Sequence, residues 1–144
     1  MLIRTVNLMA LSVAMLIVGC ASKGVRSGEK PREEIECKFK PILFADDSSS
    51  LTSKARKHLE EVAPCIKLDA RAVTIAGHAN FHKTPAYALA LSLRMAKNVA
   101  RYLLQLGVDK RLLQPVGYGA EKPVCREDTK ACKARNRRVV LGFW

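Results

Sequence analysis

Residues 86–106 restrict the fold of this chain more than any other segment. They contain no proline or glycine, and their apolar side chains recur at helical spacing in two neighbouring stripes. The stripes consist of Leu89, Leu93, Ala96, Ala100 and Leu103, and of Leu91, Met95, Val99, Tyr102 and Leu106. Polar residues fill only the narrow arc that remains, so we expect a long helix with a wide buried face, ended by Gly107 as a C-cap.

Shorter patterns supply the second layer that such a helix needs. Strands are expected at residues 39–44, 72–77, 112–116 and 138–143. A first helix is expected over residues 51–63, with caps offered by the polar residues 46–50 and an end at Pro64. Residues 78–85 are expected to form a loop, and residues 117–137 a turn and a basic loop. The order βαβαβ…β predicts a two-layer α/β (α+β) sandwich with the helices on one face of a mixed sheet.

The N-terminus has the pattern of a bacterial lipoprotein signal. Arg4 gives a positive start, and the apolar run 8–18 is too short to span a bilayer comfortably. Residues 16–20, Leu-Ile-Val-Gly-Cys, resemble the lipobox, in which the cysteine is lipid-modified before cleavage. We therefore expect lipidation of Cys20, against the alternative of an ordinary cleaved signal with an incidental cysteine. Ala21 is not the aspartate that retains lipoproteins in the inner membrane, so an outer-membrane anchor is expected.

Three parts of the chain follow from this pattern. Residues 1–19 are the expected signal peptide, and residues 20–36 are the lipidated cysteine with a flexible tether, rich in glycine, serine, lysine and proline. Residues 37–144 remain for one domain, which would face the periplasm.

The other four cysteines suit disulfide bridges in an oxidising compartment. Four cysteines allow three pairings. Cys125 and Cys132 flank a short polar stretch and suit a local bridge, which leaves Cys37 to pair with Cys65 near the end of the first helix.

A zinc site is the alternative use of these cysteines, but the chain has no paired CxxC motif. His78 and His82 lie around a predicted strand end rather than on one helix face, so we expect loop residues rather than ligands. We expect neither a metal nor a cofactor.

The formal net charge of +12 favours anionic partners. A secretion signal and an aromatic content of only 6% argue against nucleic acid as the partner. The basic cluster near the C-terminus is typical of a solvated face, and its natural targets would be anionic glycans or lipid headgroups. Its residues are Lys122, Arg126, Lys130, Lys133, Arg135, Arg137 and Arg138. No nucleophile and base are arranged for catalysis, so we do not expect an enzyme.

Several motifs occur together, in one order and at one spacing, between about residues 42 and 141. They are Ile75-x-Gly77-His78, then Tyr87 with Leu91-Ser92, Ala96 and Val99, then Gly107-Val108, then Gly117-Tyr118-Gly119 with Pro123, and finally Asn136-Arg137-Arg138-Val139. This set resembles the OmpA-like domain family, which includes the OmpA C-terminal domain and the peptidoglycan-associated lipoproteins. The resemblance implies the same sandwich fold and a non-covalent grip on peptidoglycan.

In that family a carboxylate holds the ammonium of diaminopimelate and an arginine holds its carboxylate. The resemblance places the pocket at Asp47, His78, Asn80, Ala88, Met95 and Arg137. Asn80 replaces the family's acid, Met95 its arginine and Ala88 an asparagine. Two lost contacts of roughly 1.5–3 kcal/mol each would weaken binding about a hundredfold. The simpler interpretation is that Met95 is a core residue and Asn80 a turn residue.

Two functions follow from the resemblance. The first is a structural or interaction subunit of the envelope, with other envelope or secretion-complex proteins as partners. Similar lipoproteins occur in the outer-membrane complexes of type IVB (Dot/Icm-like) secretion systems. The second is a peptidoglycan-binding protein that tethers the outer membrane to the cell wall through a modified pocket at Asp47, Asn80 and Arg137.

Overall fold

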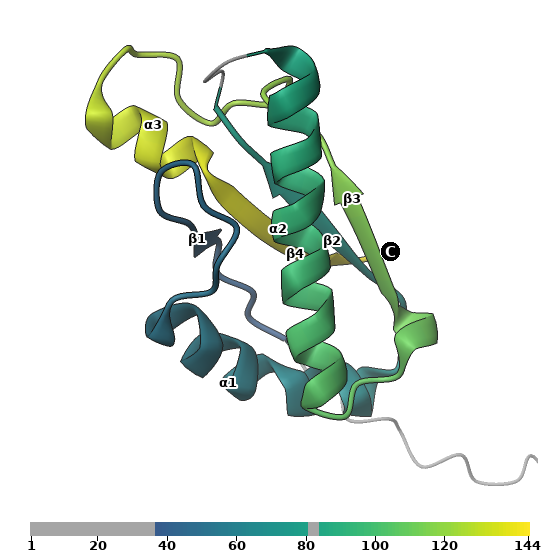
Figure 1. The fold of residues 1–144 in the computed structure, drawn as a ribbon. Helices are drawn as coiled ribbons and strands as arrows, with labels where there is room; N and C mark the ends of the chain where they lie inside the picture. Colours follow the sequence, from purple (N-terminus) through teal and green to yellow (C-terminus); the bar gives the residue numbers. More distant parts are fainter. Residues whose placement is uncertain (1–36, 81–83) are drawn as a thin grey trace, which may run out of the picture. The chain divides into compact units, whose positions relative to one another are not determined.

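The computed structural model describes residues 37–80 and 84–144, and the expected lipidation site Cys20 lies outside them. The elements are β1 (Ile42–Leu43), α1 (Ser53–Asp69), β2 (Val73–His78), α2 (Pro85–Gln105), a short 3-10 turn η1 (Lys110–Leu112), β3 (Leu113–Gly117), α3 (Lys130–Asn136) and β4 (Arg138–Phe143) (Figure 1). Among the described helices, none is both long and apolar enough to cross a membrane.

The four strands form one mixed sheet in the order β1-β4-β2-β3. β2 runs parallel to β3, whereas β4 is antiparallel to both β2 and β1. The edges of the sheet are therefore β1, which has only two residues, and β3, which carries Pro115. Figure 1 shows α2 lying across β2 and β3. The expected two-layer sandwich with a mixed sheet is confirmed.

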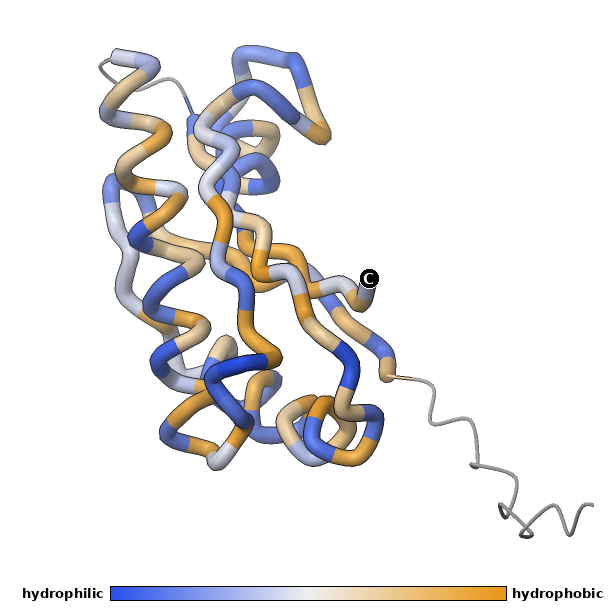
Figure 2. The backbone as a smooth tube through the Cα atoms, turned by 90° about the vertical axis from the view of Figure 1, so that its right-hand side faces the viewer, coloured by the Kyte–Doolittle hydropathy of each residue, from blue (hydrophilic) through white to orange (hydrophobic). Residues whose placement is uncertain are grey.

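The core lies between the helices and the sheet. Its most deeply buried side chains are Leu59 and Ile66 of α1, Val73 and Ile75 of β2, Met95, Val99 and Leu103 of α2, and Val139 of β4. Hydrophobic and hydrophilic residues alternate along α2 with the spacing of a helix (Figure 2). Leu89 is an exception to the expected stripes, because 49% of it is exposed.

Glycine is required where α2 comes closest to β2. A Cβ atom added to Gly77 would lie 2.0 Å from the backbone oxygen of Ser92, which is far inside contact distance. Ser92 itself is buried, donates to the Leu89 carbonyl and accepts the N–H of Gly119. This contact holds the N-terminal half of α2 against the end of β2.

The first helix extends beyond its expected end. α1 runs from Ser53 to Asp69 and contains Pro64, where the sequence predicted a stop. Pro64 lies on the exposed side, while Ile66 continues the apolar stripe and is completely buried. The burial of Ile66 offsets the hydrogen bond that proline removes. The start was also wrong by two residues, since Thr52 is the N-cap and accepts from Ala55 N–H.

Two other local predictions need correction. The first strand was expected over residues 39–44, but only Ile42–Leu43 pairs with β4. Part of the expected basic loop folds instead into α3, Lys130–Asn136, in which only Cys132 is buried. Both differences arise where tertiary contacts, rather than a repeating apolar pattern, fix the backbone.

Candidate functional site

The candidate pocket positions come from four parts of the chain: the segment after β1, the end of β2 with the residues after it, α2, and the residue between α3 and β4. Asn80 follows β2 and is only 8% exposed. Its side-chain amide donates to the backbone carbonyl oxygen of Lys133, with nitrogen and oxygen 2.9 Å apart. Asn80, which we expect in place of the family's acid, is thus tied to α3.

The expected position of the family's arginine is apolar and buried. Met95 is 1% exposed and belongs to the core on α2, and Ala88 on the same helix is completely buried. Arg94, the neighbouring residue, is exposed on the polar side of the helix. The simpler interpretation of Met95 as a core residue therefore agrees with the structure.

The charged residues that remain at pocket positions contact other groups of the chain. Asp47 accepts a hydrogen bond from the hydroxyl of Tyr87 on α2. Arg137 places one guanidinium nitrogen 3.3 Å from a carboxylate oxygen of Asp46, and its Nε donates to the Phe44 carbonyl at 3.4 Å. The sequence motifs did not single out Asp46 as the partner of Arg137.

His78 was expected in a loop, but it is the last residue of β2 and only 5% exposed. It lies opposite Arg138 in the β2–β4 register and stacks on Tyr118, with ring centroids 5.4 Å apart. Burial, together with the charges of Arg138 and Lys122, lowers the pKa of His78 to about 4. Its Nδ1 has no hydrogen-bond partner among the described residues.

The basic cluster is only in part a solvated face. Arg138 is 8% exposed, and its guanidinium donates to the carbonyl oxygens of Lys122 and Asn136. The Lys122 ammonium lies 3.9 Å from the ring centroid of Tyr118. Both cations therefore contact groups of their own chain close to His78, and they do not form a free binding surface.

Both expected disulfides are present. Cys37 and Cys65 have Cα atoms 5.8 Å apart, and Cys125 and Cys132 have Cα atoms 5.4 Å apart. Their pairing removes the thiolates that the alternative zinc site would need. Among residues 37–80 and 84–144, no three side chains of His, Cys, Asp or Glu gather as metal ligands would.

Asn136 secures the loop that the second bridge closes. Its Oδ1 accepts from the backbone N–H groups of Val124 and Cys125, and its Nδ2 donates to the Cys125 carbonyl. Together with the Cys125–Cys132 bridge, these bonds hold α3 in the position from which Lys133 meets Asn80.

Comparison with known proteins agrees with this geometry. A family model described as the OmpA family matches residues 43–137. The chain belongs to the OmpA family. It is 34% identical to the peptidoglycan-associated lipoprotein of Pseudomonas aeruginosa over 156 residues, covering 92% of this chain and 93% of that protein. It is 32% identical to the protein of the same name from Pseudomonas putida, with the same coverage.

Two solved structures show the same fold. The crystal structure of the peptidoglycan-associated lipoprotein from Burkholderia pseudomallei is similar with a TM-score of 0.70 and 32% identity, covering 73% of this chain and 90% of that one. The C-terminal domain of Helicobacter pylori MotB has a TM-score of 0.69 at 21% identity, covering 74% and 85%. The second likeness concerns the fold alone.

Membership of this family has two consequences. The relatives are named lipoproteins, which confirms the expected class: an outer-membrane, lipid-anchored protein with a periplasmic domain. The family is structural rather than enzymatic, in agreement with the expectation that the chain is not an enzyme. Lipidation of Cys20 itself stays a prediction.

Proposed function

We propose that this OmpA-family lipoprotein acts as a structural and interaction subunit of the cell envelope and that its diaminopimelate clamp is degraded. In this proposal, residues 1–19 are removed, Cys20 carries the lipid, residues 20–36 form the tether and residues 37–144 form the periplasmic domain. The observation that carries the proposal is the pair of changed positions: Asn80 is bonded to Lys133, and Met95 is buried in the core.

Charge balance supports the loss of the clamp. The diaminopimelate side chain is zwitterionic, and each of its charges needs an opposite partner once water is removed. Asn80 offers no negative charge to the ammonium, and Met95 offers no positive charge to the carboxylate. Arg137 remains, but its guanidinium already contacts Asp46. We therefore expect weak binding of peptidoglycan.

Cosedimentation with purified sacculi tests the proposal. The wild-type lipoprotein should pellet much less than an OmpA-family control that has the family's acid and arginine. In the double variant Asn80→Asp with Met95→Arg, the fraction of protein that stays folded should pellet well above wild type, because both charges are restored together. Thermal melting of each variant separates failed binding from failed folding. Strong pelleting of the wild type, without a gain on restoration, would contradict the proposal.

A genuine peptidoglycan-binding protein is the second candidate. It is favoured by the name of the relatives that cover nine-tenths of this chain, peptidoglycan-associated lipoprotein. In that case Asp47, Asn80 and Arg137 would form a modified pocket. If this second candidate is correct, the Arg137→Gln variant should no longer pellet with sacculi. If the first candidate is correct, Arg137→Gln should not change the pelleting.

A secretion complex is a narrower version of the first candidate. Co-purification of secretion-system proteins with the lipid-anchored chain would support this version.

The lipid anchor is tested by Cys20→Ser, which should release the domain from the outer-membrane fraction. Continued partitioning of this variant with the membrane at high salt would show that lipid is not the anchor.

A further inference from the structure

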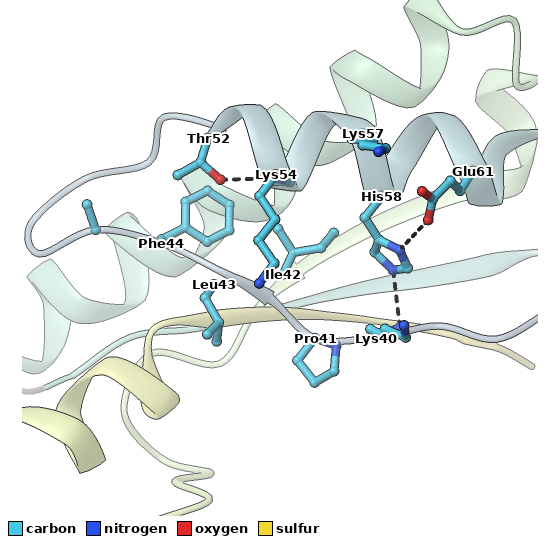
Figure 3. A pocket seen from close by; sticks show the side chains of 12 residues that line it. Lys40, Pro41, Ile42, Leu43, Phe44, Thr52, Lys54, Lys57, His58 and Glu61 are labelled. Carbon is cyan, nitrogen blue, oxygen red and sulfur yellow. Dashed lines mark hydrogen bonds and ion pairs between the residues drawn. The ribbon is translucent and has the colours of Figure 1, made fainter.

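A groove of about 730 Å³ runs between β1 and α1 (Figure 3), and none of the pocket positions described above lines it. Its floor is apolar and includes Ile42, Phe44 and Ala55, all of which belong to the core. Leu43 lies at its side with half of its surface exposed. Because those three core residues are almost completely buried, the exposed apolar surface of the groove comes from Pro41, Leu43 and Ala45, at one edge of the sheet.

The backbone of β1 is available along this groove. β1 is the edge strand, and its inner side is paired to β4 by bonds such as Phe44 N–H to the Arg137 carbonyl, 3.0 Å. Backbone groups of neighbouring residues alternate between the two sides of a strand, so those of Leu43 point away from β4. Pro41, on the same side of the chain, has no N–H, so the N–H and carbonyl of Leu43 are the groups of β1 to which an added strand would bond.

Positive charge surrounds the groove. Lys54 and Lys57 belong to α1, and Lys40 belongs to the segment before β1. All three lysines are exposed and line the rim of the groove. Within the described part of the chain, no carboxylate forms an ion pair with any of them. Glu61 is the acidic residue that lines the groove, and it lies 3.8 Å from His58.

The groove is already formed without an occupant. His58 Nε2 accepts the backbone N–H of Lys40 at 3.2 Å, which links α1 to the segment that leads into β1 (Figure 3). The Cys37–Cys65 bridge links the same two segments a second time, before Lys40 in the chain and after His58 on α1. A ligand would meet a fixed surface and would not have to order it first.

We propose that this groove binds an extended acidic peptide segment of another envelope protein, which adds as a strand to β1. The side chains at every second position of the segment would face α1. Among these, the apolar ones would lie over the groove and the acidic ones would lie near Lys40, Lys54 and Lys57. A second copy of this chain fits less well, because pairing two β1 edges would bring both sets of lysines together. The proposal rests on the proposed interaction role, and it assigns the protein contact to residues other than the clamp positions. Sacculus binding and peptide binding are therefore tested by different variants.

The test uses the full-length lipoprotein in nanodiscs of zwitterionic lipid and fluorescent peptides of ten residues. In one peptide, valine and glutamate take turns at every second position, with threonine at the positions between them, so that both face α1. A second peptide has lysine in place of glutamate, and a third is the acidic peptide with methylated backbone nitrogens. Fluorescence anisotropy should show binding of the acidic peptide alone, weakened by added salt. Equal binding of the methylated peptide would overturn strand addition, and no binding at millimolar concentration would overturn the site.

Matched variants separate the groove from general charge attraction. Replacing the three rim lysines together by glutamine should weaken binding about tenfold, whereas the same change at Lys97, Lys110 and Lys130 should have little effect. Leu43→Pro should abolish binding without a large change in melting temperature, because the N–H it removes points away from β4. Equal weakening of peptide binding by both triple lysine variants would overturn the proposal. Self-association of the wild type that is lost only in the variant of Lys40, Lys54 and Lys57 would also overturn it.

Discussion

The side chain of Asn80 and the backbone of Lys133 are joined by a 2.9 Å hydrogen bond that ties the end of β2 to α3. An aspartate at position 80 would replace the donor by a second acceptor. We expect Asn80→Asp to lower the free energy of unfolding by about 1–3 kcal/mol at pH 7, because two oxygens would face each other in a buried place. Urea denaturation measures the loss.

Measurements at acid pH distinguish repulsion between the two oxygens from a general loss of stability. Once protonated, the carboxyl group introduced by Asn80→Asp would again donate a hydrogen bond, so the difference from wild type should shrink toward pH 4. Asn80→Ala is the matched control, since it removes the donor without adding an acid, and its defect should not depend on pH in this way. A stable Asn80→Asp variant at pH 7 would show that the bond to Lys133 contributes little.

Gly77 and Gly142 make a matched pair for the contact between α2 and the sheet. A Cβ atom at position 77 would meet the Ser92 carbonyl at 2.0 Å, whereas one at position 142 would have nothing within 4 Å. We expect Gly77→Ala to cost about 3 kcal/mol or more or to prevent folding. Gly142→Ala should change stability by at most about 0.5 kcal/mol. Similar melting temperatures for the two variants would contradict this packing.

His78 should make the domain less stable in mild acid. The unfolded chain takes up a proton near the ordinary histidine pKa of about 6.5, whereas folded His78 stays neutral down to about pH 4. The unfolded state therefore binds more protons in this window, and the free energy of unfolding falls as the pH falls from 6.5 to 4, by up to about 3 kcal/mol. Urea denaturation across this range should show a flatter dependence for His78→Gln. An unchanged slope in that variant would place the effect elsewhere.

The two bridges should contribute unequally to stability. Cys37 and Cys65 are 28 residues apart, and Cys125 and Cys132 only 7. Chain entropy predicts about 3.6 kcal/mol for the longer loop and about 2.5 kcal/mol for the shorter one. Paired serine substitutions, compared by urea denaturation, check this order. The reverse order would mean that the anchoring of α3 by its bridge outweighs loop length.

Periodicity predicted those elements whose burial is regular. The long helix was expected over residues 86–106 and lies at Pro85–Gln105, and the last strand was placed without error at Arg138–Phe143. Each has a continuous buried face, which leaves a repeating pattern in the sequence. Pro64 was wrongly predicted to end the first helix. The general tendency of proline to end helices was given more weight than the apolar stripe that continues to Ile66.

The candidate site was harder to predict for a different reason. α3 buries only Cys132, and it is held by a bridge and by the side chain of Asn136, neither of which leaves a periodic signal. The family resemblance located Asn80 and Met95, and the burial of Met95 followed from its stripe. The bonds from Asn80 to Lys133 and from Arg137 to Asp46 depend on how distant segments meet, which no local pattern encodes.

The two edges of the sheet differ in how well they can pair with an added strand. β3, at the far edge, carries Pro115, which has no N–H to give to an incoming strand. A segment added at β1 would therefore lengthen the sheet by one strand, and β3 would remain a poor template for a second. Lipid-anchored proteins are concentrated in the plane of the membrane, where open edges on both sides would promote polymerisation into fibres. This asymmetry lets neighbouring copies bind other proteins in a crowded layer and still remain separate molecules.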